Sequence, residues 1–259
     1  MTQQVPSNPP LRVPAAWHGK PLWVLLAIAA AAWSFLAWLA IDMDSEIAQL
    51  TMPGSRDWSF TNVAAIASMW AIMMAAMMMP SALPAILTFT RLSMRSHQPA
   101  RAVSFLAGYL LTWLAFSACA TAAQWGLQAA GWVDAMIVSR SPWLSTILLA
   151  IAGVYQFTRI KRACLAQCQS PVSLLLGSWR PGTWGALTMG AHYGVFCLGC
   201  CWALMALLFV GGVMNLAWIA ALTVVVAAEK LGPAGHRIGN MLGLLLLGAA
   251  VYKLMTIAN

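Results

Sequence analysis

Long runs of apolar residues with almost no charge are the feature that most limits how this chain can fold. The first run, Leu22–Ile41, has 20 residues and no charged side chain, which is enough helix to cross the hydrocarbon core of a bilayer. Only 8% of the 259 residues are charged, whereas soluble domains carry about 25%. We therefore expect an integral membrane protein that is surrounded by a lipid bilayer.

The apolar runs predict an all-α fold, a polytopic transmembrane helix bundle of about seven spans. The spans are expected at Leu22–Ile41, Phe60–Thr90, Val103–Trp125, Trp143–Ile160, Trp184–Val210, Val213–Ala228 and Ile238–Met255. Residues 1–21 are expected to form a polar, proline-rich tail, and residues 22–259 a single transmembrane domain. Pro80 and Pro84 lie inside the second span. Because proline removes a helical hydrogen bond, a kink or a break is expected near Pro80.

The distribution of charge predicts a cytoplasmic N-terminus. With seven spans in that orientation, 11 of the 14 Lys and Arg residues lie on the cytoplasmic side. Basic residues near the ends of spans set orientation in membranes. The net charge of +8 is therefore attributed to topology, and no nucleic acid partner is expected. Glu229 and Lys230, at the end of the sixth span, are expected to pair with each other at the membrane surface.

Methionines are concentrated in the second span. Six of the protein's 16 methionines lie in the eleven residues from Met69 to Met79. They form two rows at four-residue spacing, which places each row on one face of a helix. The first row is Met69, Met73 and Met77, and the second is Met74 and Met78. Thioether sulfur is a soft ligand that favours Cu(I).

Cysteines are concentrated in the fifth span, in the run CLGCC. Cys197, Cys200 and Cys201 lie within one turn of helix, and Met205 follows one turn later. At a rise of about 1.5 Å per residue, these thiols are expected at the same membrane depth as the methionines of the second span. Zinc would more often take four Cys or His ligands, so the excess of thioethers favours Cu(I). The sequence therefore predicts that the two spans face each other and bind Cu(I).

Three further residues are candidate metal ligands outside these two runs. Cys164 and Cys168 are four residues apart beside a basic segment, where they form either a site of copper uptake or release or two incidental thiols. His192 lies in the fifth span and is either a ligand or a hydrogen-bonded structural residue. Cys119 is expected only to pack.

No nucleotide-binding, serine-hydrolase or metalloprotease motif occurs in the chain. The chain alone is therefore not expected to be an ATP-driven pump or another enzyme. Two alternatives to copper binding remain open. One is a membrane thiol-disulfide oxidoreductase that uses the CxxCC cysteines. The other is a non-catalytic membrane assembly subunit in which Met and Cys serve only as apolar packing residues.

Four segments resemble a known family over about Ala64 to Lys230. They are AMMMP in the second span, GYLLTW at Gly108–Trp113, YQFTRIKRACLAQC at Tyr155–Cys168 and CLGCCWALMALLFVGGVMNLAW at Cys197–Trp218. The chain is similar to the bacterial predicted metal-binding integral membrane proteins, some of which are regarded as copper chaperones for tyrosinase-type polyphenol oxidases. The resemblance implies copper binding at the Met and Cys positions above, a place in the bacterial inner membrane, and a copper-requiring client enzyme.

Overall fold

The computed structural model describes residues 20–53, 58–95, 97–134, 136–170, 177, 179–232 and 234–258. The helices in this part of the chain are α1 (Lys20–Ile41), α2 (Glu46–Thr51), α3 (Phe60–Arg95), α4 (Pro99–Ala129), α5 (Pro142–Gln156), α6 (Arg159–Gln169), α8 (Gly182–Ala206), α9 (Leu208–Gly211), α10 (Leu216–Leu231) and α11 (Gly235–Ala258). Outside the helices, Val133 and Ser139 form an isolated β-bridge. The all-α fold is confirmed. Residues 1–19 of the predicted tail lie outside the described residues.

Among the described residues, five helical segments are long and apolar enough to cross a membrane. They are Leu22–Ile41, Phe60–Met94, Pro99–Ala129, Gly182–Gly211 and Gly235–Ile257. The α5 and α6 helices meet at a bend of 64° and make a sixth segment if they count as one span. The α10 helix stands where a sixth span was predicted. It has only 16 residues, so it is about 24 Å long and shorter than a hydrocarbon core of about 30 Å. The count of seven spans and the cytoplasmic N-terminus therefore stay predictions.

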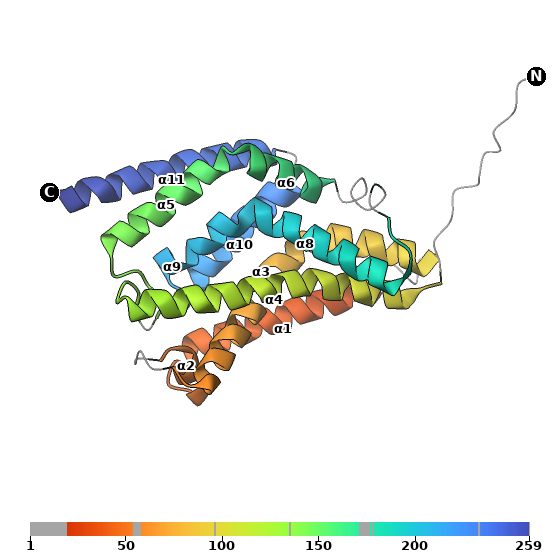
Figure 1. The fold of residues 1–259 in the computed structure, drawn as a ribbon, viewed down its shortest axis with the longest axis horizontal. Coiled ribbons are helices and arrows are strands. Elements are labelled where there is room, and N and C mark those ends of the chain that lie inside the picture. The colour runs from red at the N-terminus through yellow and green to blue at the C-terminus, as the bar shows by residue number, and fades with distance from the viewer. Residues whose placement is uncertain are drawn as a thin grey trace, which may run out of the picture.

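The helices pack along the long axis of the molecule (Figure 1). The α3 helix packs between α1 and α4, and α8 packs on α4. The α5 and α11 helices pair with each other on the far side of the bundle (Figure 1). The short α10 helix contacts α3, α6, α8 and α11. This central place puts the end of α10 among the sulfur-bearing helices.

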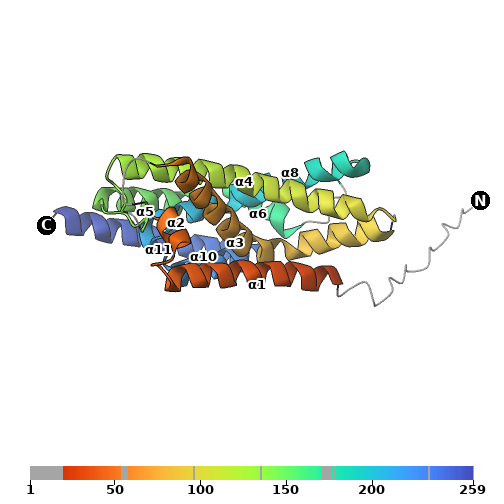
Figure 2. The same cartoon turned by 90° about the horizontal axis from the view of Figure 1, so that it is seen from below.

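The α3 helix continues through Pro80 and Pro84 without interruption, and it changes direction along its length (Figure 2). A kink or a break was expected near Pro80, and of these two the break is not found. Pro80 has no N–H group to donate to the carbonyl of Ala76 one turn earlier. The indole Nε1 of Trp33 on α1 donates to that carbonyl oxygen instead, at 3.2 Å. A neighbouring helix thus replaces the missing hydrogen bond.

Small residues let α4 and α8 approach closely. A Cβ atom added at Gly108 would lie 2.0 Å from the carbonyl oxygen of Leu187, and one at Gly190 would lie 1.9 Å from that of Phe105. Both distances are too short for any side chain. Glycine at these two positions fixes α8 against α4 by direct backbone contact, as is common where membrane helices pack.

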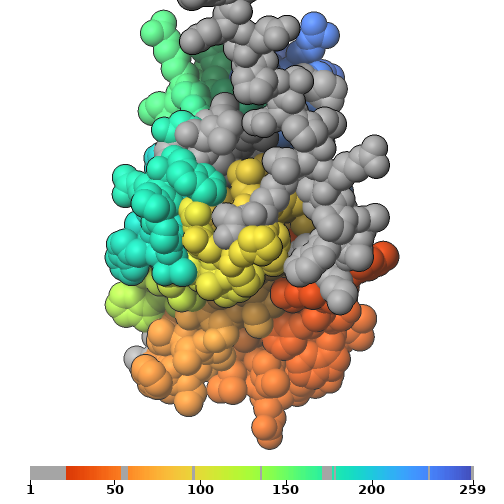
Figure 3. Space-filling model, turned by 90° about the vertical axis from the view of Figure 1, so that its right-hand side faces the viewer, coloured from red at the N-terminus to blue at the C-terminus, as the bar shows by residue number. Residues whose placement is uncertain are grey.

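At one end of the bundle, the turn between α3 and α4 meets the start of α8, and both are visible in Figure 3 as the yellow and teal surfaces. Arg101 at the start of α4 is buried there and donates through Nη2 to the carbonyl oxygen of Arg180, at 2.8 Å. Its guanidinium group also lies 4.3 Å from the ring centroid of Trp179. These contacts hold the beginning of α8 in place.

Candidate metal centre

The methionines of α3 are all inside the protein. No side chain of the six between Met69 and Met79 is more than 2% exposed. This follows from the position of α3, which is covered by α1, α4 and α10. The methionine rows therefore face other helices and do not face lipid.

The thiols of the CLGCC run are buried as well. Cys197, Cys200 and Cys201 are each 2% exposed or less, and Met205 is fully buried. The thiols of Cys200 and Cys201 both donate to the carbonyl oxygen of Cys197, at 3.1 and 3.0 Å. In this state the two thiols are held by the backbone of their own helix.

The two sulfur-bearing helices approach each other through Met78. Its Sδ lies 3.9 Å from Cys201 Sγ. The hydroxyl of Tyr109 on α4 donates to the carbonyl oxygen of Met78 at 3.2 Å, and it lies 3.3 Å from Cys197 Sγ. Met78 belongs to the second methionine row, which was not among the predicted ligands. The predicted approach of the two helices exists, and the residue that makes this contact is one position away from Met77.

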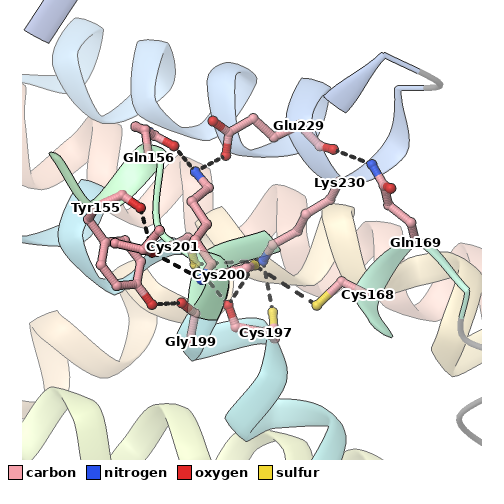
Figure 4. A network of polar contacts seen from close by, with 12 residues as sticks. Tyr155, Gln156, Cys168, Gln169, Cys197, Gly199, Cys200, Cys201, Glu229 and Lys230 are labelled. Carbon is pink, nitrogen blue, oxygen red and sulfur yellow. Dashed lines mark hydrogen bonds and ion pairs between the residues drawn. The ribbon is translucent and has the colours of Figure 1, made fainter. Parts of the chain in front are cut away.

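The ammonium group of Lys230 lies among these sulfur atoms (Figure 4). Its Nζ is 2.9 Å from Cys197 Sγ, 3.6 Å from Met78 Sδ and 3.7 Å from Cys201 Sγ. The residue is only 4% exposed, although it comes from the last turn of α10. The sulfur cluster, as we call the side chains of Met78, Cys197 and Cys201, thus surrounds one buried positive charge.

The predicted surface pair of Glu229 with Lys230 is wrong. Glu229 is 1% exposed and pairs through Oε2 with Lys161 Nζ of α6, at 2.7 Å. Lys161 also donates to Gln156 Oε1, and Figure 4 shows this polar group beside the cysteines. The side chains of neighbouring residues on a helix point about 100° apart. Glu229 therefore contacts α6, while Lys230 contacts α3 and α8. The ion pair joins α6 to α10.

The α6 helix brings a fourth buried thiol to the cysteines of α8. Cys168 Sγ lies 3.9 Å from Cys200 Sγ. Close packing is possible because residue 199 is glycine, where an added Cβ would lie 2.7 Å from Cys164 Sγ. The hydroxyl of Tyr155 also donates to the carbonyl oxygen of Gly199. Cys164 is half-buried and Cys168 buried, so both predicted residues of α6 lie against α8.

The remaining predicted ligands lie in three different surroundings. Met73, Met77 and Met205 are buried in their helices. Met69 lines a small apolar cavity together with residues of α1, such as Leu36, and of the segment that leads into α10, such as Met214. His192 is exposed, and its ring packs against Phe196 at a centroid distance of 4.8 Å. The fold therefore leaves His192 outside the sulfur cluster.

Cysteines, histidines and acids do not form a conventional metal site here. Among the described residues, no three Cys, His, Asp or Glu side chains are arranged so that they could hold one ion together. What the fold brings together is two thiols with one thioether. That donor set is poor for zinc and suits a soft monovalent cation.

Two residues of the site were missed in the sequence: Met78, which belongs to the sulfur cluster, and Lys230, which the cluster surrounds. Met78 was visible as part of the second row, but helical spacing alone does not say which row faces the cysteines. Lys230 carried a stronger signal, since it directly follows an apolar run and an ionisable residue within a membrane helix is by default a functional candidate. It was instead assigned to the surface together with Glu229.

The family comparison covers the whole of this region. Residues 67–253 match the family model described as PpoB2, copper chaperone. The chain belongs to this copper chaperone family. The matched region includes the methionines of α3, the cysteines of α6 and α8, and Lys230. No curated protein and no solved structure matches the chain.

Proposed function

We propose that this protein binds Cu(I) in the membrane through sulfur ligands on facing helices, and that it carries or delivers the ion to a copper-requiring client enzyme. It would act in the bacterial inner membrane and would not be a catalyst. One observation carries the proposal: Met78 Sδ, Cys197 Sγ and Cys201 Sγ, from two different helices, all lie within 3.7 Å of one buried point. Membership of the copper chaperone family supports copper as the cargo.

The chemistry of the cluster suits this cargo. Thiolate and thioether sulfur select Cu(I) over harder cations, and burial excludes the water that would compete for the ion. The thioethers of Met69, Met73 and Met77 extend along α3 away from the cluster and are proposed to pass copper along the helix. Cys168, 3.9 Å from Cys200, continues the sulfur groups toward α6. Cys164, Met205 and His192 are kept as weaker candidates.

The number of Cu(I) ions bound per protein molecule tests the proposal. The protein is purified in detergent under anaerobic, reducing conditions, loaded with Cu(I) and freed of excess ion before bound copper is measured. We expect saturable binding in the wild type and its loss in a variant with Cys197→Ser, Cys200→Ser and Cys201→Ser. Cys119→Ser is the matched control, because that cysteine is exposed on α4. Unchanged stoichiometry in the triple variant would exclude the cluster as the copper site.

The short distance between Cys168 and Cys200 favours one alternative, a thiol-disulfide oxidoreductase. In that function the two thiols would form an S–S bond and give two electrons and two protons to a membrane quinone, which becomes the hydroquinone. Alkylation of the thiols before and after addition of quinone separates the two functions. The oxidoreductase predicts that Cys168 and Cys200 become resistant to alkylation in the absence of metal, whereas a copper carrier predicts that they stay reactive.

A further inference from the structure

Lys230 is a buried charge with unusually poor partners. Its ammonium group has three protons to donate, and its contacts in the described part of the chain are to three sulfur atoms. Sulfur is a weak hydrogen-bond acceptor, and an ammonium group that leaves water without strong partners is destabilising. The nearest acid in sequence, Glu229, is paired with Lys161 instead. Packing alone gives no reason for a lysine at this place.

The ammonium nitrogen lies between the sulfur atoms that are proposed to bind the metal ion. Two thiols and one thioether surround it from α3 and α8, at 2.9 to 3.7 Å. A lysine ammonium and Cu(I) carry the same charge of plus one. The donor atoms that suit Cu(I) therefore already enclose a cation, and that cation belongs to the protein.

We propose that Lys230 occupies the copper position in the metal-free protein and that Cu(I) must displace its ammonium group in order to bind. The inference rests on the proposed function and adds how that site is regulated. The displaced ammonium group keeps its proton, and the thiols of Cys197 and Cys201 release theirs to solvent when they bind Cu(I) as thiolates. Cu(I) and the ammonium nitrogen compete for the same three sulfur atoms, so the ion cannot reach them together while Nζ lies among them at 2.9 to 3.7 Å.

Displacement gives a carrier a useful property. The free energy needed to move the ammonium group is subtracted from the free energy of copper binding, as for any site whose binding-competent state must first be populated. When copper leaves, Lys230 returns and stabilises the empty cluster. Affinity is thereby lowered, and transfer to a client is favoured.

Substitution of Lys230 tests the proposal through copper affinity. Affinity is measured by competition with a chromogenic Cu(I) chelator under anaerobic conditions. Lys230→Gln and Lys230→Leu remove the charge without adding a sulfur ligand, and we expect each to bind Cu(I) at least about ten-fold more tightly than the wild type. Lys230→Arg keeps the charge and is expected to bind no more tightly than the wild type. Lys253→Gln on α11 is the matched control and should leave affinity unchanged.

A second measurement needs no substitution. The wild-type protein is treated with an amine-specific label with and without Ag(I), and labelling of each lysine is read by mass spectrometry. We expect several-fold more label on Lys230 when Ag(I) is bound. Lys161, which is also buried but is paired with Glu229, should stay unchanged.

The outcomes separate this inference from the proposed function. If the wild type binds no copper in a cysteine-dependent way, the proposed function fails and the inference fails with it. If the wild type binds copper but Lys230→Gln and Lys230→Leu bind it equally or more weakly, only the displacement of Lys230 is refuted. Unchanged labelling of Lys230 on Ag(I) binding refutes it as well. A merely structural role for Lys230 predicts weaker binding on substitution, which is the opposite sign.

Discussion

The indole nitrogen of Trp33 donates a hydrogen bond of 3.2 Å to the carbonyl oxygen of Ala76. The two residues are on different helices, and the carbonyl is the one that Pro80 leaves without its helical donor. Proline in a helix interior costs about 3 kcal/mol, and a replacement donor at this position offsets part of that cost. The contact also ties α1 to α3 at Ala76, one turn before Pro80.

Trp33→Phe should therefore destabilise the protein by about 1 to 3 kcal/mol, because it leaves a buried carbonyl without a donor. Thermal unfolding in detergent measures the effect. Trp23→Phe is the matched control on the same helix, since Trp23 is 69% exposed, and it should change the unfolding temperature little. Equal effects of the two substitutions would mean that the hydrogen bond to Ala76 does not contribute.

Gly190→Ala should weaken the packing of α8 on α4. The added methyl group would lie 1.9 Å from the carbonyl oxygen of Phe105, so the helices must separate, at a cost of about 1 to 3 kcal/mol. Gly126→Ala on α4 has open space around its Cβ and should be neutral or slightly stabilising. Unfolding temperatures of the two variants, measured side by side, test this; similar values would contradict close backbone contact at Gly190.

Lys161→Met should be strongly destabilising, by about 3 to 5 kcal/mol, because it leaves the buried carboxylate of Glu229 unpaired. The double variant Lys161→Met with Glu229→Leu should recover much of that loss, since it removes both charges together. Chemical denaturation of the two single variants and the double variant gives the coupling energy. Additive effects would show that the ion pair between α6 and α10 contributes nothing.

Ag(I), a redox-inert substitute for Cu(I), should stabilise the wild type against thermal unfolding. A ligand at one hundred times its dissociation constant adds about 2.7 kcal/mol. The gain should disappear in Cys197→Ser with Cys201→Ser and should persist in Cys119→Ser. It should also be reduced in Met78→Leu, which keeps the side-chain volume but removes the thioether. Stabilisation that survives loss of both thiols would place the metal elsewhere.

The helical fold, with helices long and apolar enough to cross a membrane, could be predicted because it depends on apolar length alone. The seven-span count depends on lengths near the limit, and α10 with its 16 residues falls below it. The 64° bend between α5 and α6 depends on tertiary packing that no local pattern encodes. Similarly, the short helix α2, which Ser45 caps, was not among the predicted elements.

The candidate site could be predicted at the level of helices but not of side chains. Spacing indicated that a methionine row and a cysteine row exist, and the fold places α3 and α8 so that Met78 and Cys201 touch. Which row faces the cysteines is set by the rotation of α3, which periodicity does not determine when the helix is apolar on all sides. Lys230 joined the site because the last turn of α10 lies where its side chain reaches α3 and α8, and local sequence does not determine how helices pack.

Because residue 199 is glycine, relatives of this protein can be grouped by the residue type that they have at this one position. A Cβ atom at that position would lie 2.7 Å from the Sγ of Cys164, so that thiol would have to move away. Relatives with any other residue there are expected to have lost the α6 thiols as partners of the cluster, and so to tolerate replacement of the cysteines corresponding to 164 and 168. An alignment in which residue 199 and those two cysteines vary independently would show that the two helices do not work together.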